Sequence, residues 1–347
     1  MYPKCAVKCL ARMPGIPETC SVMEAVIPPV MSMRVSEPES LKEAVRDANF
    51  SPCQISARPL ASSLDRVVCA NVCLDFADFG PAMLFSGPMP CDCYTLVFVT
   101  ACPTKGRSFN FSIEHTDGYM GFYAPGTVLD GYTPEGFASA TLTVPTCVFL
   151  AAVGKSFPEI PDAVLKLGAG LRIGPAEQAG LRVLLSAVKE CVGDDTEPLA
   201  GKIARDHLER VLLDVFLSAI RGSCASLIPR PGQRVEGRML RLRRARDFVA
   251  GSLHKPIQLE DLCGSVGLSR RGVEMLFQDS LGIGPTAFIR HQRLHGVRRA
   301  LLAANPSPGL VKKTAMEWGF WHMGHFSGGY RALFGESPSS TLMRSHS

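Results

Sequence analysis

One spacing pattern, found twice near the C-terminus, constrains the fold of this chain more than any other feature. In LEDLCGSVGLSRRGVEMLFQ, Leu259–Gln278, a small residue at Cys263 is followed four positions later by Gly267. A helix-turn-helix needs both, because its two helices cross closely at the small residue and the backbone turns left-handed at the glycine. The positions that such a pair buries carry Leu262, Val266, Leu268, Val273 and Leu276. The pattern therefore predicts a helix-turn-helix over residues 259–278.

The second helix of this predicted unit has a polar outer face. Ser269 is placed to cap its N-terminus, since a serine side chain can accept a hydrogen bond from a free backbone N–H there. The outward positions then carry Arg270, Arg271, Glu274, Met275 and Gln278. Taken alone, this stretch also fits a helical hairpin in an unrelated bundle, so further observations have to decide between the two.

The same arrangement recurs over residues 310–334. Ala315 stands at the crossing, Gly319 at the turn, and Phe326, Tyr330 and Phe334 form an apolar stripe at four-residue spacing. A connecting helix is expected between the two copies, beginning at Pro285 in the N1 position. It would bury Phe288, Leu294, Val297 and Leu301 and carry Arg290, Arg293, Arg298 and Arg299. Two such units held rigidly could enter successive major grooves of a DNA duplex.

Charge is distributed unevenly along the 347 residues. From Gly237 to the end there are 16 Lys and Arg against 7 Asp and Glu, a balance of +9, whereas residues 1–236 have 21 against 25, a balance of −4. This asymmetry indicates that the C-terminal part meets a polyanion. The arginine cluster Arg241, Arg243, Arg244 and Arg246 is interpreted either as a solvated helix face or as a phosphate contact.

The tail GFWHMGHFSGGYRALFGESPSSTL, Gly319–Leu342, resembles the closing pattern of the AraC/XylS family of bacterial regulators, and the resemblance covers residues 237–343. It implies that the first recognition helix makes most base contacts, through Arg270, Arg271, Glu274 and Met275. The second would contribute His322, Met323, Gly324 and His325, with Arg331 also expected to contact DNA. Gly328 and Gly329 stand where relatives often carry basic residues, so the second unit is expected to hold phosphates weakly.

The first two thirds of the chain have a different pattern. Short runs rich in Val, Phe, Tyr and Thr between residues 53 and 153, among them Val67–Phe76 and Tyr119–Tyr123, predict the strands of a sandwich or barrel. Residues 176–192 and 199–220 show a helical period, and these helices could close the core or pair with a second copy. The segment Gly118–Pro145 resembles the core of the cupin-like domain that family members carry, which senses a ligand or dimerises.

These patterns predict a multidomain α+β chain. The expected divisions are a disordered extension at 1–35, a β-rich cupin-like sensor domain at 36–160, a helical dimerisation segment at 161–222, a linker at 223–236 and an AraC-type DNA-binding domain with two helix-turn-helix units at 237–347.

Catalysis, cofactors and metals are not expected. Residues 1–236 hold only two histidines, His207 and His115, and His115 is interpreted as a solvated loop residue. Cys69, Cys73, Cys91 and Cys93 lack the paired spacing of a zinc site and are interpreted as small buried core residues, with a redox role as the alternative. The odd total of 13 cysteines without framework spacing favours a reducing cytoplasm, and no apolar run approaches the ~18 residues that span a bilayer.

The sequence thus predicts a sequence-specific DNA-binding transcription regulator, by family resemblance an activator rather than a repressor. Expected partners are operator DNA, RNA polymerase, a small-molecule effector and a second copy of the chain, in a cytoplasmic, nucleoid-associated location. One alternative is a ligand- or partner-binding protein that acts through protein contacts and has only weak DNA affinity. Another is an enzyme fused to a DNA-binding module.

Overall fold

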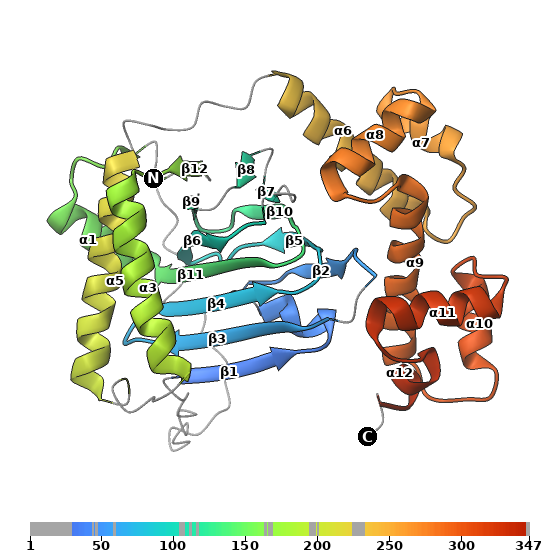
Figure 1. The fold of residues 1–347 in the computed structure, drawn as a ribbon, viewed down its shortest axis with the longest axis horizontal. Coiled ribbons are helices and arrows are strands. Elements are labelled where there is room, and N and C mark those ends of the chain that lie inside the picture. Colours follow the sequence, from blue (N-terminus) through green and yellow to red (C-terminus); the bar gives the residue numbers. More distant parts are fainter. Residues whose placement is uncertain are drawn as a thin grey trace, which may run out of the picture.

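The computed structural model describes residues 30–344 apart from 44, 46–47, 58–59, 104–107, 111–112, 116–117, 163–164, 166–168, 194–198, 200 and 224–232. It has a β-rich part flanked by helices and an all-α part on the opposite side (Figure 1). This arrangement confirms the expected multidomain α+β class. Within the described ranges, no helix is long and apolar enough to cross a membrane.

Two antiparallel sheets form the β-rich part. The larger has the strand order β1 (Val30–Val35), β3 (Ser62–Val68), β4 (Cys73–Phe79), β11 (Phe137–Pro145), β6 (Cys93–Ala101), β9 (Tyr119–Tyr123) and β12 (Ala169–Arg172). The smaller has the order β2 (Ser51–Gln54), β5 (Met83–Pro88), β10 (Val128–Thr133), β7 (Ser108–Asn110) and β8 (Ile113–His115). Apolar side chains of both sheets, among them Phe79, Phe85, Val99 and Phe137, share one buried cluster.

Helices cover the larger sheet (Figure 1): α1 (Thr146–Ser156), α3 (Pro175–Gly193) and α5 (Lys202–Ser223). Leu181 and Leu185 of α3 and Phe216 of α5 join a buried cluster with Phe98 and Phe122 of the sheet. The two helices therefore close this core, as one interpretation of their helical period predicted. Their outer sides leave Val183 and Ile203 exposed.

Three expected boundaries need correction. Strand β1 begins at Val30, inside the predicted extension, because it pairs with β3 from Val30↔Val67 to Val35↔Ser62 and so gains backbone hydrogen bonds. The predicted helical segment also contains β12, which pairs with β9. Helix α6 begins at Gln233, within the predicted linker. Residues 1–29 and 224–232, on which the rest of the extension and most of the linker fall, lie outside the described residues.

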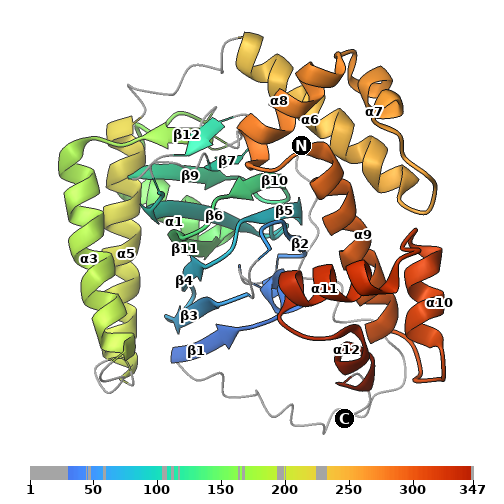
Figure 2. The ribbon, with the colours of Figure 1, turned by 45° about the vertical axis from the view of Figure 1, so that its right-hand side comes forward.

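The all-α part contains α6 (Gln233–Ser252), α7 (Leu259–Val266), α8 (Arg270–Leu281), α9 (Pro285–Leu302), α10 (Leu310–Glu317), α11 (Met323–Phe334) and α12 (Pro338–Arg344). Helix α9 runs between the pair α7–α8 and the pair α10–α11 (Figures 1 and 2). Its predicted apolar face is confirmed, since Phe288, Leu294, Val297 and Leu301 are all buried. Phe288 belongs to the core of the first pair and the other three to the core of the second.

A polar contact zone, here called the interdomain seam, joins the two parts. From the β-rich part it contains Gln54, Asp130 and the 3₁₀ helix η1 (Pro38–Glu43) with the preceding Glu37; from the all-α part, Arg246, His295, Arg298 and Arg344. Arg298 is its centre: its side chain is 1% exposed, and it pairs with Glu37 at 3.5 Å, Glu39 at 3.1 Å and Glu336. Burial alone would lower the pKa of this guanidinium, but the carboxylate of Glu39 and the bond to Glu336 raise it, so Arg298 stays charged.

Candidate nucleic-acid interface

The corner between α7 and α8 has the geometry that the sequence predicted. Gly267 ends α7 in the left-handed region with φ 66° and ψ 39°, and its N–H donates to Cys263 O at 2.9 Å. Ser269 begins α8 as its N-cap, and its Oγ accepts from the Gly272 N–H at 3.2 Å. Leu262 and Val273 are completely buried between the helices. The small residue, the glycine and the cap thus act together to fix the angle at which α8 leaves the corner.

The outer face of α8 is free of the protein core. Every side chain expected there is exposed, namely Ser269, Arg270, Arg271, Glu274, Met275 and Gln278. Arg270 lies 3.3 Å from Glu260, but both side chains are more than half exposed, so this pair is weak and leaves the guanidinium available. A groove of about 550 Å³ runs beside the helix, and Arg241 of α6 and Met275 of α8 are among the residues that line it.

The second unit repeats this construction. Gly319 has φ 82°, and the next residue, Phe320, donates from its N–H to Ala315 O at 2.9 Å. The stripe of Phe326, Tyr330 and Phe334 is buried, as its spacing predicted. Tyr330 is further held by a 2.8 Å hydrogen bond between its hydroxyl and Thr341 Oγ1 of α12. Helix α11 is therefore anchored along one side over its whole length.

The outward side of α11 carries most of its expected contact residues. His322 is the N-cap, and His322, Gly324, His325 and Arg331 are exposed. Met323 differs, since it is half-buried and packs against the core of the second unit. Trp321, in the corner before the helix, is 70% exposed. None of the sequence patterns predicted a role for Trp321, although a large aromatic residue next to a recognition helix was a usable signal.

Gly329 has a role that differs from the one expected. A Cβ atom at Gly329 would lie 2.4 Å from Nη2 of Arg290, whereas a Cβ at Gly328 would meet nothing within 4 Å. The space at Gly329 lets Arg290 reach across from α9 and donate to His325 O at 2.7 Å. A guanidinium thus lies against the first turns of α11, although the helix lacks basic residues at positions 328 and 329.

A residue cluster between the two units does not follow from any of the sequence patterns. The Trp318 ring lies so close to α9 that a Cβ at Gly296 would be 2.0 Å from it. The His254 ring also packs against Trp318, at a centroid distance of 4.1 Å. Arg293 of α9 donates to Leu253 O and Lys255 O at 3.1 and 2.7 Å. Trp318 and Arg293 therefore tie the end of α6 to α9 and to the second unit, which fixes the spacing of the two recognition helices.

The arginine cluster of α6 is divided between two surroundings. Arg246 is bound to Asp130 of strand β10, and Arg243 lies 3.9 Å from the same carboxylate. Arg241 and Arg244 are exposed. Arg243 is also exposed, so Arg241, Arg243 and Arg244 match the expected solvated face. Arg246 alone of the four is largely covered, and its ion pair with Asp130 links the all-α part to the β-rich part.

Comparison with known proteins agrees with this geometry. A helix-turn-helix domain family matches residues 262–344. The "XylDLEGF operon transcriptional activator 2" of Pseudomonas putida is 30% identical over 142 residues, which cover 40% of this chain and 85% of that relative. The chain belongs to the AraC/XylS family. This membership confirms the predicted resemblance and removes the unrelated helical hairpin as an interpretation of residues 259–278.

Other relatives of this AraC/XylS-family chain match mainly its C-terminal part. The "Probable thc operon regulatory protein" of Rhodococcus erythropolis is 36% identical over 101 residues, 29% of this chain and 30% of the relative. The chain thus matches less than a third of the length of the first curated relative. The solved structure of the AraC-like transcriptional activator CuxR is 16% identical and covers 77% of this chain and 94% of its own, with a TM-score of 0.41.

The cysteines and the histidine considered for metal binding have different surroundings. Cys69, Cys73 and Cys93 are buried as expected, but Cys91 is exposed, because it lies in the turn before β6. His115 belongs to strand β8, where its backbone pairs with Ser108, and not to a loop. Among the described residues no three histidine, cysteine or acidic side chains gather in a way that could hold a metal ion.

Proposed function

We propose that this AraC/XylS-family protein is a sequence-specific DNA-binding transcription regulator. The observation that carries the proposal is the pair of recognition helices, α8 and α11, each anchored by a buried apolar stripe and each leaving a polar face exposed. The exposed residues of α8, with Arg270 and Arg271 foremost, read base edges, and the basic surface around them holds phosphates. The second half of the DNA site is contacted by the exposed residues of the second unit, His322, Gly324, His325 and Arg331.

The charge balance supports the same proposal. The +9 balance of residues 237–347 would attract the DNA backbone, and each phosphate contact releases counterions from the duplex. Binding should therefore weaken steeply as salt rises.

The test is a gel shift of the full chain with DNA from upstream of its neighbouring genes, compared with random DNA of equal length over a series of salt concentrations. We expect retardation at low salt, a steep salt dependence and a salt range in which only the upstream DNA is bound. Absence of retardation at low salt contradicts DNA binding. Equal affinity for both DNAs throughout contradicts sequence specificity and supports the alternative, a protein that acts through protein contacts with weak DNA affinity.

The β-rich part is proposed to sense a small-molecule effector or to carry the dimer contact. Helix α3 supports a dimer contact, since Ala179, Val183 and Ala187 lie exposed on one side of it while Leu181 and Leu185 are buried on the other. Charge on this face, as in Val183→Asp, should shift the chain toward monomer in sedimentation analysis. Activation through RNA polymerase, in a cytoplasmic, nucleoid-associated setting, completes the proposal and follows from the activators among the relatives.

A further inference from the structure

The groove of about 550 Å³ beside α8 lies between two elements of the all-α part. Arg238 and Arg241 line it from α6, and Leu268, Gly272 and Met275 line it from the corner and from α8. Helices α6 and α8 lie next to each other (Figures 1 and 2). A ligand in this groove therefore contacts both the first helix-turn-helix unit and the helix that precedes it.

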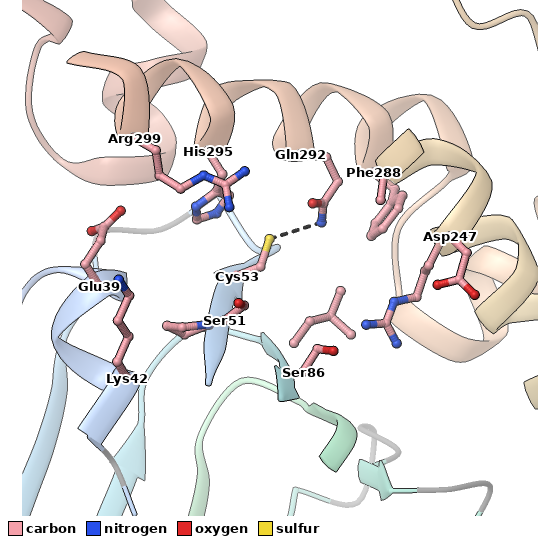
Figure 3. Close-up of a pocket in the computed structure, with 14 residues that line it drawn as sticks. Glu39, Lys42, Ser51, Cys53, Ser86, Asp247, Phe288, Gln292, His295 and Arg299 are labelled. Atoms are coloured by element: carbon pink, nitrogen blue, oxygen red, sulfur yellow. Dashed lines mark hydrogen bonds between the residues drawn. The ribbon is translucent and has the colours of Figure 1, made fainter. Parts of the chain in front are cut away.

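The two arginines of the groove belong to the N-terminal half of α6. Farther along the helix, Asp247 lines a different cavity, which lies at the interdomain seam (Figure 3). Arg246 lines that cavity too and is bound to Asp130. The two halves of α6 therefore have different surroundings, because the second half meets the β-rich part and the first half leaves its cations beside the recognition helix.

The protein does not neutralise these two cations. Arg238 and Arg241 form no ion pair or side-chain hydrogen bond with any other described residue. Among the described residues that line the groove, two guanidinium groups stand against one carboxylate, that of Asp279, which leaves a net charge of +1. The Nε of Arg238 is also buried without a hydrogen-bond partner. A buried donor in this state is destabilising, and an acceptor that enters the groove would satisfy it.

An anionic phosphate fits these groups. A guanidinium binds phosphate oxygens through two parallel N–H···O bonds, which the opposite charges strengthen. Leu268 and Met275 give the same groove an apolar side, and Met275 is 53% exposed. The backbone of a nucleic acid offers both kinds of surface, since its phosphates alternate with the C–H faces of its sugars.

The place of the groove on α8 points to a strand backbone, and not a base, as its occupant. Gly272 of the groove directly follows Arg271 of the outer face, and Asp279 directly follows Gln278. The groove therefore lies on a flank of the helix, about 100° from the side that reads base edges. A helix in the major groove has base edges in front of it and a phosphate strand on each flank. The flank next to α6 consequently faces one of these two strands.

We propose that the groove between α6 and α8 holds the sugar–phosphate backbone of one DNA strand. Arg238 and Arg241 bind its phosphates, and Leu268 and Met275 contact the deoxyribose between them. Both arginines are positioning residues, because phosphate contacts set the register of a protein on DNA and carry no sequence information. The inference rests on the proposed function and adds to it a DNA contact that lies outside the two helix-turn-helix motifs.

The test measures how DNA affinity depends on salt in the full chain and in the variant R238Q/R241Q. The DNAs are a duplex that the full chain selects from a random library and an unselected duplex of equal length. We expect the variant to bind both duplexes about tenfold or more weakly, by the same factor, because two charge-assisted bonds are lost. The slope of log affinity against log salt should become shallower by about 0.9 for each phosphate contact removed.

Arg244→Gln is the matched control, since Arg244 is an exposed arginine of α6 that does not line the groove. This control should keep the affinity and the salt slope of the unchanged chain. Thermal unfolding shows whether each variant is folded. Should R238Q/R241Q be unstable, R241Q alone changes an exposed position and should still make the slope shallower by about 0.9.

A second measurement locates the contact on the DNA. Single phosphates of the selected duplex are replaced, one position at a time, by neutral methylphosphonates. We expect positions on one strand at which the replacement weakens binding of the unchanged chain but has little effect on R238Q/R241Q. A variant that is only destabilised would show the same pattern of losses as the unchanged chain, so the difference between the two patterns reports the contact itself.

An unaltered salt slope in both variants, or one methylphosphonate pattern shared by R238Q/R241Q and the unchanged chain, overturns the proposal and leaves the proposed function standing. A loss of affinity confined to the selected duplex also overturns it, since it would mean that the arginines read bases. Absence of DNA binding by the unchanged chain overturns the proposed function itself.

Discussion

The surroundings of an arginine in the all-α part decide what its charge can do. Arg298 is enclosed by carboxylates. Arg293 donates its N–H groups to two backbone carbonyls, Leu253 O and Lys255 O. Arg290 gives one N–H to His325 O and remains exposed. Arg271 is exposed and has no side-chain bond to another described residue. The sequence places all four in a basic region, but only Arg271 and Arg290 are accessible to a nucleic acid.

Arg271→Ala should reduce discrimination between operator and random DNA. A well-formed arginine contact with a base edge contributes about 1–3 kcal/mol of specificity, so the affinity ratio should fall about tenfold or more. Titration of both DNAs at one salt concentration measures this ratio, and Arg210→Ala on α5 provides the control. An equal loss of affinity for both DNAs would mean that Arg271 contacts only phosphate.

The two adjacent glycines of α11 should respond in opposite ways to alanine. Gly328→Ala meets open space and should stabilise the helix by up to about 1 kcal/mol, with DNA affinity unchanged. Gly329→Ala displaces the Arg290 guanidinium from His325 and should lower DNA affinity despite the same gain in helix propensity. Unfolding and DNA-binding curves of both variants test the difference. Equal DNA affinities for both variants would show that Arg290 has no part in binding.

Among the elements, those defined by local signals were predictable. The glycine at each corner, the cap at Ser269 and the stripe Phe326, Tyr330 and Phe334 follow from short-range spacing, and the structure places them as predicted. Strand β9 was also predicted at its observed bounds, Tyr119–Tyr123. In contrast, the predicted run Val67–Phe76 is not one strand, since it crosses the turn between β3 and β4, at which the Cys69 N–H donates to Val72 O. The run looked continuous in the sequence because its apolar residues belong to two adjacent strands of one buried face.

Contacts between residues distant in the sequence could not be predicted. Trp318 looks like an ordinary core aromatic, and only the structure shows Gly296 beneath it and His254 beside it. Arg298 looks like a candidate phosphate contact, but Glu37 and Glu39, some 260 residues earlier in the chain, enclose it. No periodicity in a single sequence identifies such partners. The candidate site was therefore predictable on its exposed faces but not in the contacts that set their spacing.

Gly296→Ala should disturb the junction between the two helix-turn-helix units. Its Cβ would lie 2.0 Å from the Trp318 ring, which cannot shift without repacking both cores, and we expect a loss of about 1–3 kcal/mol in stability. DNA affinity should fall further than stability predicts, since the two recognition helices lose their fixed spacing. Gly264→Ala, a glycine of α7 with open space around it, is the control for helix propensity. Unchanged stability in Gly296→Ala contradicts this role for Trp318.

At the scale of the whole molecule, the free energy of unfolding should depend on pH through His295 of the interdomain seam. Burial lowers the pKa of His295 to about 4, although the bond between its Nε2 and Gln54 O at 2.9 Å and the charge of Glu39 raise it, while Arg299 and His291 lower it. The unfolded chain takes up this proton near pH 6.5 and the folded chain only near pH 4, so the stabilising contribution is present above pH 6.5 and is lost progressively as pH falls to about 4.

The free energy of unfolding should therefore fall by about 2 kcal/mol from this group between pH 6.5 and 5. His295→Gln should remove that part of the pH dependence, and His207→Gln on α5 should keep it. Urea unfolding at several pH values measures the slope. A slope that His295→Gln leaves unchanged would place the acid sensitivity elsewhere in the chain.

The enclosure of Arg298 also limits which foreign sensor domains can be joined to the all-α part in a chimera. Its carboxylate partners come from both parts of the chain, Glu37 and Glu39 on one side and Glu336 on the other. A chimera that joins residues 237–347 to a foreign sensor removes two of the three carboxylate partners of Arg298, and where the new sensor covers this arginine without replacing them, the uncompensated buried charge destabilises strongly. Grafts of this segment should therefore function only when the donor sensor brings two acidic residues to the same place, or when Arg298 is replaced by an apolar residue of similar length such as methionine.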